Sequence, residues 1–185
     1  TIVKLAVEKI LKKNVLVVGA GIKTGLNIRI DNPAQLGSDL VVDSVAAIVE
    51  YPAPLLIFDL GTANTVCVID KNKNYIGGMI YPGIGVSLDS LTAHASQLGG
   101  ISIEAPEHMI GKNTTECMKS GLIYSSAAAM DGIIDRLQEQ LGGEATVIAT
   151  GGLAKKIVSH CRREIILDDD LLLKGLAIIY KKNRK

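Results

Sequence analysis

The sequence predicts an α/β fold in which three antiparallel strands come first and helices follow. Apolar runs of strand length, separated by short polar turns, occupy residues 55–80. Helical periodicity then dominates residues 87–98 and 113–141. A further apolar run at residues 145–150 leads through two glycines into another helical pattern. This order of elements is typical of layered α/β domains.

The composition limits the possible partners. The chain has 185 residues, of which 48% are hydrophobic, and this is enough for a buried core in one domain or in two small lobes. Its 20 basic and 19 acidic residues give a formal net charge of +1, so no broad positive field attracts nucleic acid or an anionic membrane. Only 3% of the residues are aromatic, which argues against base stacking on single strands. We therefore expect no nucleic-acid partner and no membrane partner.

Cysteine usage indicates the compartment. The three cysteines form no C-x-x-C pair, and no stretch has the pattern of a signal peptide. No apolar run approaches the roughly 18 residues of a membrane span. These features predict a cytoplasmic protein in a reducing environment. The chain opens at Thr1 within a helical pattern and without a methionine, so we expect further sequence upstream.

The first part of the chain alternates helix and strand patterns. Residues 2–11 have apolar positions at helical spacing, and residues 15–18 have the pattern of a buried strand that ends at Gly19. After a glycine-containing loop, residues 38–51 return to helical periodicity. Asp39 lies at the start of that helix. The pattern predicts a helix that leads into a sheet, and then a second helix.

Two prolines, Pro52 and Pro54, predict a boundary between lobes. Neither can continue the preceding helix, and an apolar run follows at once. We expect residues 1–53 to be the remainder of a first lobe that carries a substrate loop. Residues 54–185 are expected to form a second lobe with a phosphate loop and a closing helix.

Within the second lobe, the strands and helices are expected in a fixed order. Three antiparallel strands come first, and helices with two further strands follow them. The expected strands are residues 55–60, 65–70, 75–80, 145–150 and 164–167, and the expected helices are residues 87–98, 113–141, a helix from residue 153, and a last helix that ends at residue 181.

The segment Asp-Leu-Gly-Thr-Ala-Asn-Thr at residues 59–65 is the first candidate site. It places a carboxylate at a strand end, before a tight turn that is rich in hydroxyl groups. Gly61 lets the backbone approach a phosphate, and Thr62 can donate a hydrogen bond to it. Asp59 can hold a cation that offsets the phosphate charge. The same residue types are common in plain hairpin turns, so an ordinary connection is the alternative.

Two further segments are candidates. Gly151 and Gly152 stand between a strand and a helix, where the backbone can approach a phosphate or a planar ligand, although a tight connection has the same pattern. Asp39 is placed to accept a proton from an alcohol. It can instead cap its helix, which is the commoner use of such an aspartate and contributes about 0.5–2 kcal/mol.

Taken together, these motifs resemble the type III pantothenate kinases. The similar segments follow one another along nearly the whole chain, at residues 25–29, 31–33, 36–39, 59–63, 75–78, 82–84, 111–114, 120–121 and 147–154. The resemblance implies the ribonuclease-H-like lobes of the superfamily that contains actin, hexokinase and acetate kinase, with the first lobe incomplete. It also implies ATP-dependent phosphorylation of pantothenate, the first step of coenzyme A biosynthesis, by a homodimer.

The resemblance also implies roles for single residues. Asp39 would be the general base, and Asp59 would bind a monovalent cation, K⁺ or NH₄⁺, beside the Mg²⁺ that accompanies ATP. The pantothenate site would consist of Gly37, Ser38, Asp39, Leu40 and Thr114, and the ATP site of Gly61, Thr62, Gly151 and Gly152.

Departures from the family pattern keep a second hypothesis open. The family's N-terminal D-x-G-N-T phosphate segment has no counterpart in this chain. Leu40 stands where an arginine usually follows the catalytic aspartate, Ile30 replaces an aromatic residue, and Cys67 replaces an aspartate. We expect these changes to lie around the ligands, which favours a non-catalytic paralogue that binds nucleotide or pantothenate as a regulatory module. A third hypothesis, an actin-like filament protein, leaves residues 32–39 and 111–114 unexplained.

Overall fold

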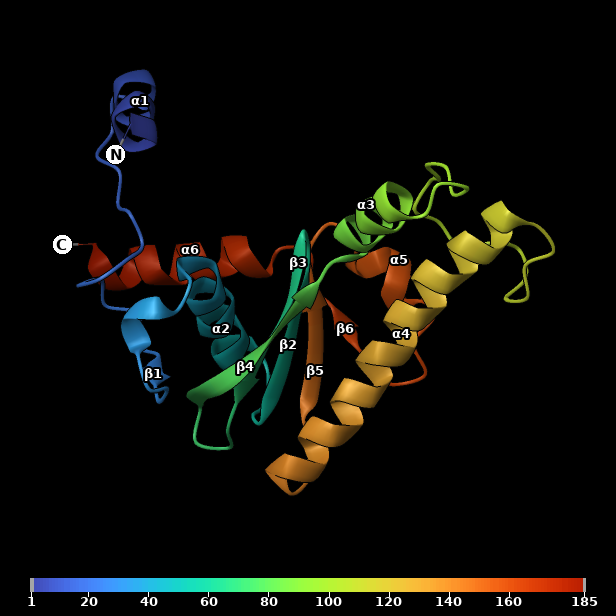
Figure 1. Ribbon diagram of the computed structural model, residues 1–185. Helices are drawn as coiled ribbons and strands as arrows, with labels where there is room; N and C mark the ends of the chain where they lie inside the picture. The colour runs from blue at the N-terminus through green and yellow to red at the C-terminus, as the bar shows by residue number, and fades with distance from the viewer. Residues whose placement is uncertain (1, 185) are drawn as a thin grey trace.

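A computed structural model describes residues 2–184 of the chain (Figure 1). These residues form six strands and six α-helices, with a short 3-10 helix at Pro33–Gln35. The strands are β1 (Asn27–Ile28), β2 (Leu55–Leu60), β3 (Ala63–Ile69), β4 (Asn74–Pro82), β5 (Thr146–Thr150) and β6 (Ile166–Leu167). The helices are α1 (Ile2–Leu11), α2 (Ser38–Glu50), α3 (Ile84–His94), α4 (Thr114–Leu141), α5 (Ala154–Val158) and α6 (Leu171–Asn183).

The strands form one mixed sheet in the order β1-β4-β3-β2-β5-β6. The predicted meander is confirmed, because β2 pairs antiparallel with β3, and β3 pairs antiparallel with β4. β5 lies beside β2 and runs parallel to it, with Asp59 opposite Thr150 at the carboxyl end of both strands. β1 pairs parallel with β4, so the sheet contains strands from both sides of the expected boundary at residue 53.

Helices cover both faces of the sheet (Figure 1). Because successive side chains of a strand point to opposite faces, β2 contributes to two cores. Leu56, Phe58 and Leu60 pack in the cluster that includes residues of α3, α4 and α5. Leu55 and Ile57 pack in the cluster that includes residues of α2. All five side chains are at most 1% exposed, which explains why β2 has apolar residues on both faces, with Asp59 as the exception near its end.

The segment before β1 differs from the prediction. Helix α1 forms as expected, but none of its residues is buried, and it stands apart from the sheet in Figure 1. Residues 15–18, which we expected to form a buried strand, have no regular secondary structure. Their side chains are half-buried or exposed, so the apolar run lacks the neighbouring strand that would make it part of the sheet. None of the helices within residues 2–184 has both the length and the apolarity needed to cross a membrane.

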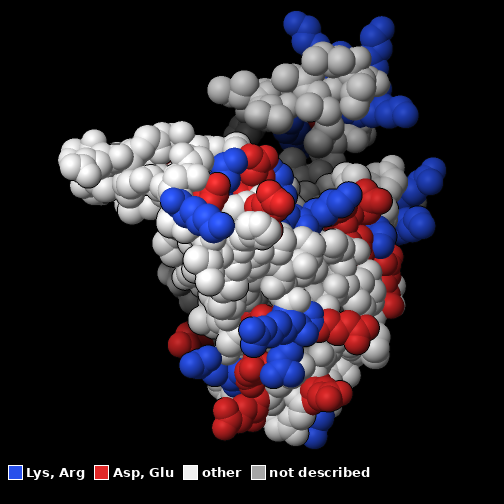
Figure 2. All heavy atoms as spheres, turned by 90° about the vertical axis from the view of Figure 1, so that its right-hand side faces the viewer, with Lys and Arg blue, Asp and Glu red and all other residues white. Residues whose placement is uncertain are grey.

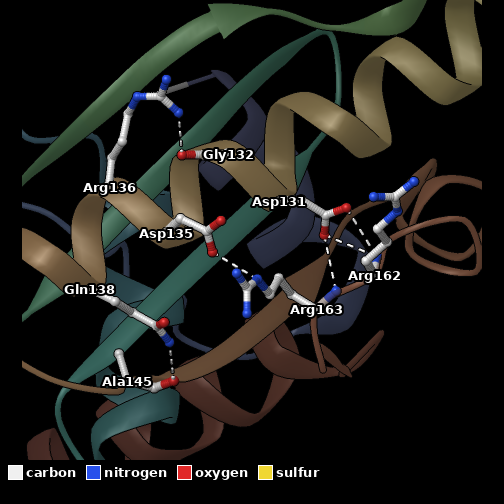
Figure 3. Close-up of polar contacts among 8 residues, drawn as sticks. All are labelled: Asp131, Gly132, Asp135, Arg136, Gln138, Ala145, Arg162 and Arg163. Carbon is white, nitrogen blue, oxygen red and sulfur yellow. Dashed lines mark hydrogen bonds and ion pairs between the residues drawn. The ribbon is translucent and has the colours of Figure 1, made fainter.

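Polar contacts fix α4 to the segment between α5 and β6 (Figure 3). The backbone N–H groups of Arg162 and Arg163 both donate to the Asp131 carboxylate at 3.0 Å. The Arg163 side chain also pairs with Asp135, with Nε 2.7 Å from Oδ1. Figure 2 shows this side of the molecule, where acidic and basic side chains are intermixed around a wide uncharged area. These contacts hold the connection that leads into the edge strand β6.

Helices α2 and α6 make close contact through Gly175. A Cβ atom at this position would overlap with the backbone carbonyl oxygen of Val42 on α2. Both residues are buried, so an added side chain at Gly175 could not turn away into solvent. The absence of a side chain at Gly175 therefore sets the distance between the two helices that cover this face.

We expect Gly175→Ala to lower the free energy of unfolding by roughly 1–3 kcal/mol, because an added methyl group overpacks this contact. Gly121→Ala is the matched control, since Gly121 is exposed within α4 and a Cβ atom there meets nothing within 4 Å. The control variant is expected to be as stable as the wild type, or more stable by up to about 1 kcal/mol, because alanine favours helix. Urea denaturation measures both variants. Equal stability of Gly175→Ala and the wild type would contradict this account of the packing.

Candidate functional site

The carboxyl ends of β2 and β5 open into a pocket of about 580 Å³. Its lining contains four aspartates, a glycine pair and a single lysine: Asp39, Asp43, Asp59, Thr150, Gly151, Gly152, Lys155, Asp169 and Leu172. Four of these nine residues, Asp39, Asp59, Gly151 and Gly152, were candidate site residues in the sequence. The fold thus brings together segments that lie more than a hundred positions apart in the chain.

The turn after β5 requires glycine. Gly151 has a φ of +96°, a left-handed backbone conformation that residues other than glycine rarely adopt. A Cβ atom there would also lie 2.7 Å from the Leu60 backbone nitrogen. The Leu153 N–H donates to the Leu60 carbonyl at 3.3 Å, which holds the start of the next turn against β2. This packing presents the backbone of Gly151 and Gly152 to the pocket beside Asp59.

The amino end of α2 supplies Asp39. Gly37 is the N-cap residue, and its lack of a side chain leaves space for the Asp39 carboxylate, because a Cβ atom there would overlap with Asp39 Oδ1. No side chain caps this helix end, so Asp39 does not serve as the N-cap that its position allowed. Asp39 is exposed and lines the pocket from the first turn of α2. Gly37, Ser38 and Leu40 adjoin it but do not line the pocket.

Sequence reasoning missed Asp43, which lies one turn after Asp39 on α2. Its side chain is only 2% exposed, and its Oδ1 atom is buried without a hydrogen-bond partner in the described structure. The residue lies within a run of eight buried positions from Val41 to Ile48. The available signal was its spacing of four residues from Asp39, which places both carboxylates on one face of the helix.

Burial and mutual repulsion change the acidity of these carboxyl groups. Burial, together with the neighbouring charges of Asp59, Asp39 and Asp168, raises the pKa of Asp43 to about 7. Burial and the charge of Asp39 also raise the pKa of Asp59. The pocket therefore concentrates negative charge that its protein surroundings do not compensate, and a cation or a proton is favoured there.

Asp168, close to this pocket, is a contrasting buried carboxylate. It is 6% exposed, and it accepts hydrogen bonds of 2.7 Å from the Tyr51 hydroxyl and from Lys174 Nζ. Burial alone would raise the pKa of Asp168, but these two donors lower it below its ordinary value. The network ties the end of β6 and the start of α6 to the end of α2. Asp168 is thus a paired structural carboxylate, whereas Asp43 is not paired.

Besides Gly37, Ser38 and Leu40, three further expected ligand contacts lie outside the pocket lining. Gly61 and Thr62 form the turn between β2 and β3, and this turn packs on Gly83, whose N–H donates to the Thr62 carbonyl at 3.0 Å. Thr114 is the exposed first residue of α4, next to its N-cap Asn113, which accepts from the Glu116 N–H at 3.0 Å. The roles expected for these three residues stay predictions.

The three residues that depart from the family pattern are not pocket residues. Cys67 belongs to the buried cluster between α2 and the sheet, and Ile30 and Leu40 pack against that cluster. Burial raises the pKa of the Cys67 thiol to about 12, so it is a poor nucleophile. None of the three residues lines the pocket at β2 and β5, and the expectation that they lie around the ligands stays a prediction.

Metal coordination is not preformed here. Within residues 2–184, no three His, Cys, Asp or Glu side chains converge to hold a metal ion. The pocket carboxylates nevertheless suit a hard cation that takes its other ligands from phosphate and water, because Mg²⁺ usually binds through only one or two carboxylates and substrate oxygens.

Comparison with known proteins identifies relatives over most of the chain. The family model for type III pantothenate kinase matches residues 1–136. A type III pantothenate kinase from Exiguobacterium sp. strain AT1b is 46% identical over 170 residues, which are 92% of this chain and 66% of that protein. One from Bacillus cytotoxicus is 46% identical over 176 residues, which are 95% of this chain and 67% of that protein. The chain thus spans about two thirds of the length of these relatives.

Solved structures show the same fold at lower identity. A protein described as a Baf family transcriptional activator, from Campylobacter jejuni, superposes with a TM-score of 0.57 at 22% identity, over 86% of this chain and 70% of that one. The ethanolamine utilization protein EutJ from Carboxydothermus hydrogenoformans gives a TM-score of 0.51 at 15% identity, over 95% and 70% of the two chains. The expected α/β fold, a meander followed by helices, is confirmed.

The raised pKa of Asp43 predicts a pH-dependent stability. The folded protein keeps this proton up to about pH 7, whereas the unfolded chain releases it near 3.8. The Asp43 contribution to stability is therefore present below pH 3.8 and is lost as the pH rises to about 7. Asp43→Asn removes the titrating group without changing its shape. We expect this variant to lose less stability than the wild type between pH 5 and pH 8 in urea denaturation.

Asp89→Asn is the control for this measurement, because Asp89 is exposed on α3 and does not line the pocket. It is expected to lose as much stability between the two pH values as the wild type does. An equal loss in Asp43→Asn and the wild type would show that Asp43 is not the buried titrating group.

Proposed function

Since the chain belongs to the type III pantothenate kinase family, we propose that it transfers the γ-phosphoryl group of ATP to the primary hydroxyl group of pantothenate. The product is 4'-phosphopantothenate, the first intermediate of coenzyme A biosynthesis. The observation that carries the proposal is the pocket in which Asp39, Asp59 and the Gly151-Gly152 turn meet. Phosphoryl transfer needs a base, a bound cation and a phosphate-binding backbone, and these three segments can supply them.

Asp39 is proposed as the general base. Its carboxylate is exposed at the first turn of α2 and lines the pocket, so a bound alcohol can reach it. Phosphoryl transfer passes through a loose transition state, so the base mainly orients the hydroxyl group and accepts its proton late. A carboxylate can perform this role without a strongly raised pKa. Gly37, Ser38 and Leu40 would form the adjoining wall for pantothenate.

The glycine turn is proposed to hold the nucleotide. Gly151 and Gly152 expose their backbone to the pocket at the carboxyl ends of two parallel strands, where ligands of open α/β sheets bind. Gly61 and Thr62 would donate to a phosphate from the neighbouring turn after β2. Positioning and charge neutralisation, rather than covalent chemistry, would supply most of the rate.

Cations fit the acidic side of this pocket. We propose that Asp59 holds a monovalent cation, K⁺ or NH₄⁺, and that Mg²⁺ enters with ATP. The support is that burial, together with repulsion from neighbouring carboxylates, raises the pKa values of Asp43 and Asp59, and a bound cation relieves this repulsion. The cations would neutralise charge that develops on the transferred phosphoryl group.

A homodimer in the cytoplasm is the proposed setting. Thr114 does not line the pocket of its own chain, and we propose that it contacts pantothenate across the subunit contact. In such a dimer, Thr114 of one subunit would approach the pocket of the other.

We expect Asp39→Asn to lower kcat for pantothenate-dependent ADP formation by about 10²- to 10⁴-fold, because the amide cannot accept the hydroxyl proton. The assay contains MgATP, K⁺ and pantothenate, and it is run on this chain and on any longer form that the gene encodes. Asp89→Asn serves as the control and is expected to keep the wild-type rate. Equal rates for Asp39→Asn and the wild type would exclude Asp39 as the base.

The same assay separates the kinase from a non-catalytic binding module. A folded wild-type protein that binds both MgATP and pantothenate, yet releases no ADP in any form of the chain, would contradict catalysis and favour the binding module.

A further inference from the structure

Among the described residues that line the pocket, Lys155 is the only basic one, and four aspartates line the same pocket. Lys155 lies in the first turn of α5, three positions after Gly152. The sequence pattern gave no reason to select it, because it belongs to a Lys-Lys pair on a short helix. The fold distinguishes the two lysines.

The two neighbouring lysines have different contacts. Lys156 Nζ donates to the Ile103 carbonyl at 2.9 Å and therefore ties α5 to the segment after α3. Lys155 forms no ion pair within 4.0 Å in the part of the chain that the structure describes, although aspartates line the same pocket. Its ammonium group is thus exposed at the pocket without a direct counter-charge.

The charged side chains of the pocket come from different elements of its wall. Asp39 and Asp43 come from α2, Asp59 from β2 and Asp169 from the segment between β6 and α6, whereas Lys155 comes from α5, beside the glycine turn. An anion that enters this pocket is repelled by the carboxylates unless it lies beside Lys155 or carries its own cation. A phosphate group with a bound cation can interact favourably with both kinds of charge, since the cation can face the carboxylates while the free oxygens face the ammonium group.

We propose that Lys155 binds a phosphate oxygen of the nucleotide, an inference that rests on the proposed function. Lysine is a common phosphate ligand because its compact charge needs no fixed geometry. The position of Lys155 favours the nucleotide over pantothenate, because Lys155 lies at the start of the helix that follows the Gly151-Gly152 turn. Leu40, on the α2 side, offers no positive charge for this purpose.

Binding measurements on the folded chain test the proposal. Isothermal titration with MgATP alone, and separately with pantothenate alone, compares the wild type with Lys155→Ala, Lys155→Arg and Lys156→Ala. We expect Lys155→Ala to weaken MgATP binding by about ten- to a hundredfold, the usual effect of a lost charged hydrogen bond. Lys155→Arg is expected to keep most of the affinity, Lys156→Ala to match the wild type, and pantothenate binding to be unchanged in all variants.

Each contrary outcome has a distinct meaning. Equal MgATP affinity in Lys155→Ala and the wild type would overturn the assignment of Lys155 and leave the proposed function intact. Loss of pantothenate affinity alone in Lys155→Ala would overturn the phosphate assignment, because the lysine would then bind the pantothenate carboxylate. Absence of MgATP binding by the folded wild type would overturn this inference together with the proposed function. Thermal melting confirms that each variant is folded, as expected for a change at an exposed side chain.

Discussion

The parallel pairing of β2 with β5 is the constraint on which the pocket depends. It places Asp59 opposite Thr150, so the carboxylate at the end of one strand lies beside the glycine turn at the end of the other. Both strands are almost completely buried between two helical layers, which fixes this register. Gly151 then packs on the backbone of β2, where a larger residue has no space. Helix α2 adds two further aspartates because its buried face docks on the same sheet.

The two most buried aspartates near this pocket differ in their contribution to stability. Asp168 has two hydrogen-bond donors at 2.7 Å and a lowered pKa, so it links secondary-structure elements at little electrostatic cost. Asp43 is still less exposed, but it has an unpaired oxygen and a pKa raised to about 7. A buried carboxyl group without partners opposes folding. Its presence in a pocket wall is consistent with a site that is completed by a ligand or a cation rather than by the protein alone.

The sequence was sufficient for most of the fold and for part of the site. The strands of the meander and the long helix α4 follow directly from apolar periodicity, and Asp59 and Gly151 were identified because strand ends followed by glycine carry a recognisable pattern. The prediction of a strand at residues 15–18 was wrong. An apolar run indicates side chains that favour burial, but it does not show whether a neighbouring strand is present. Asp43 was missed since the apolar residues around it in α2 predict a buried face, where a carboxylate is not expected. Lys155 was missed because its role depends on a distant strand and helix, which local sequence does not encode.

The central claim is that the pocket at the ends of β2 and β5 is where the nucleotide binds. Amide chemical-shift mapping of the ¹⁵N-labelled chain with added Mg-ADP tests it most directly, because every backbone N–H reports its own surroundings. The account predicts that the largest shifts occur at Asp59, Gly151, Gly152 and Lys155, with little change in the α4 segment around Asp131. Saturable shifts centred on α4, with the glycine turn unaffected, would contradict it.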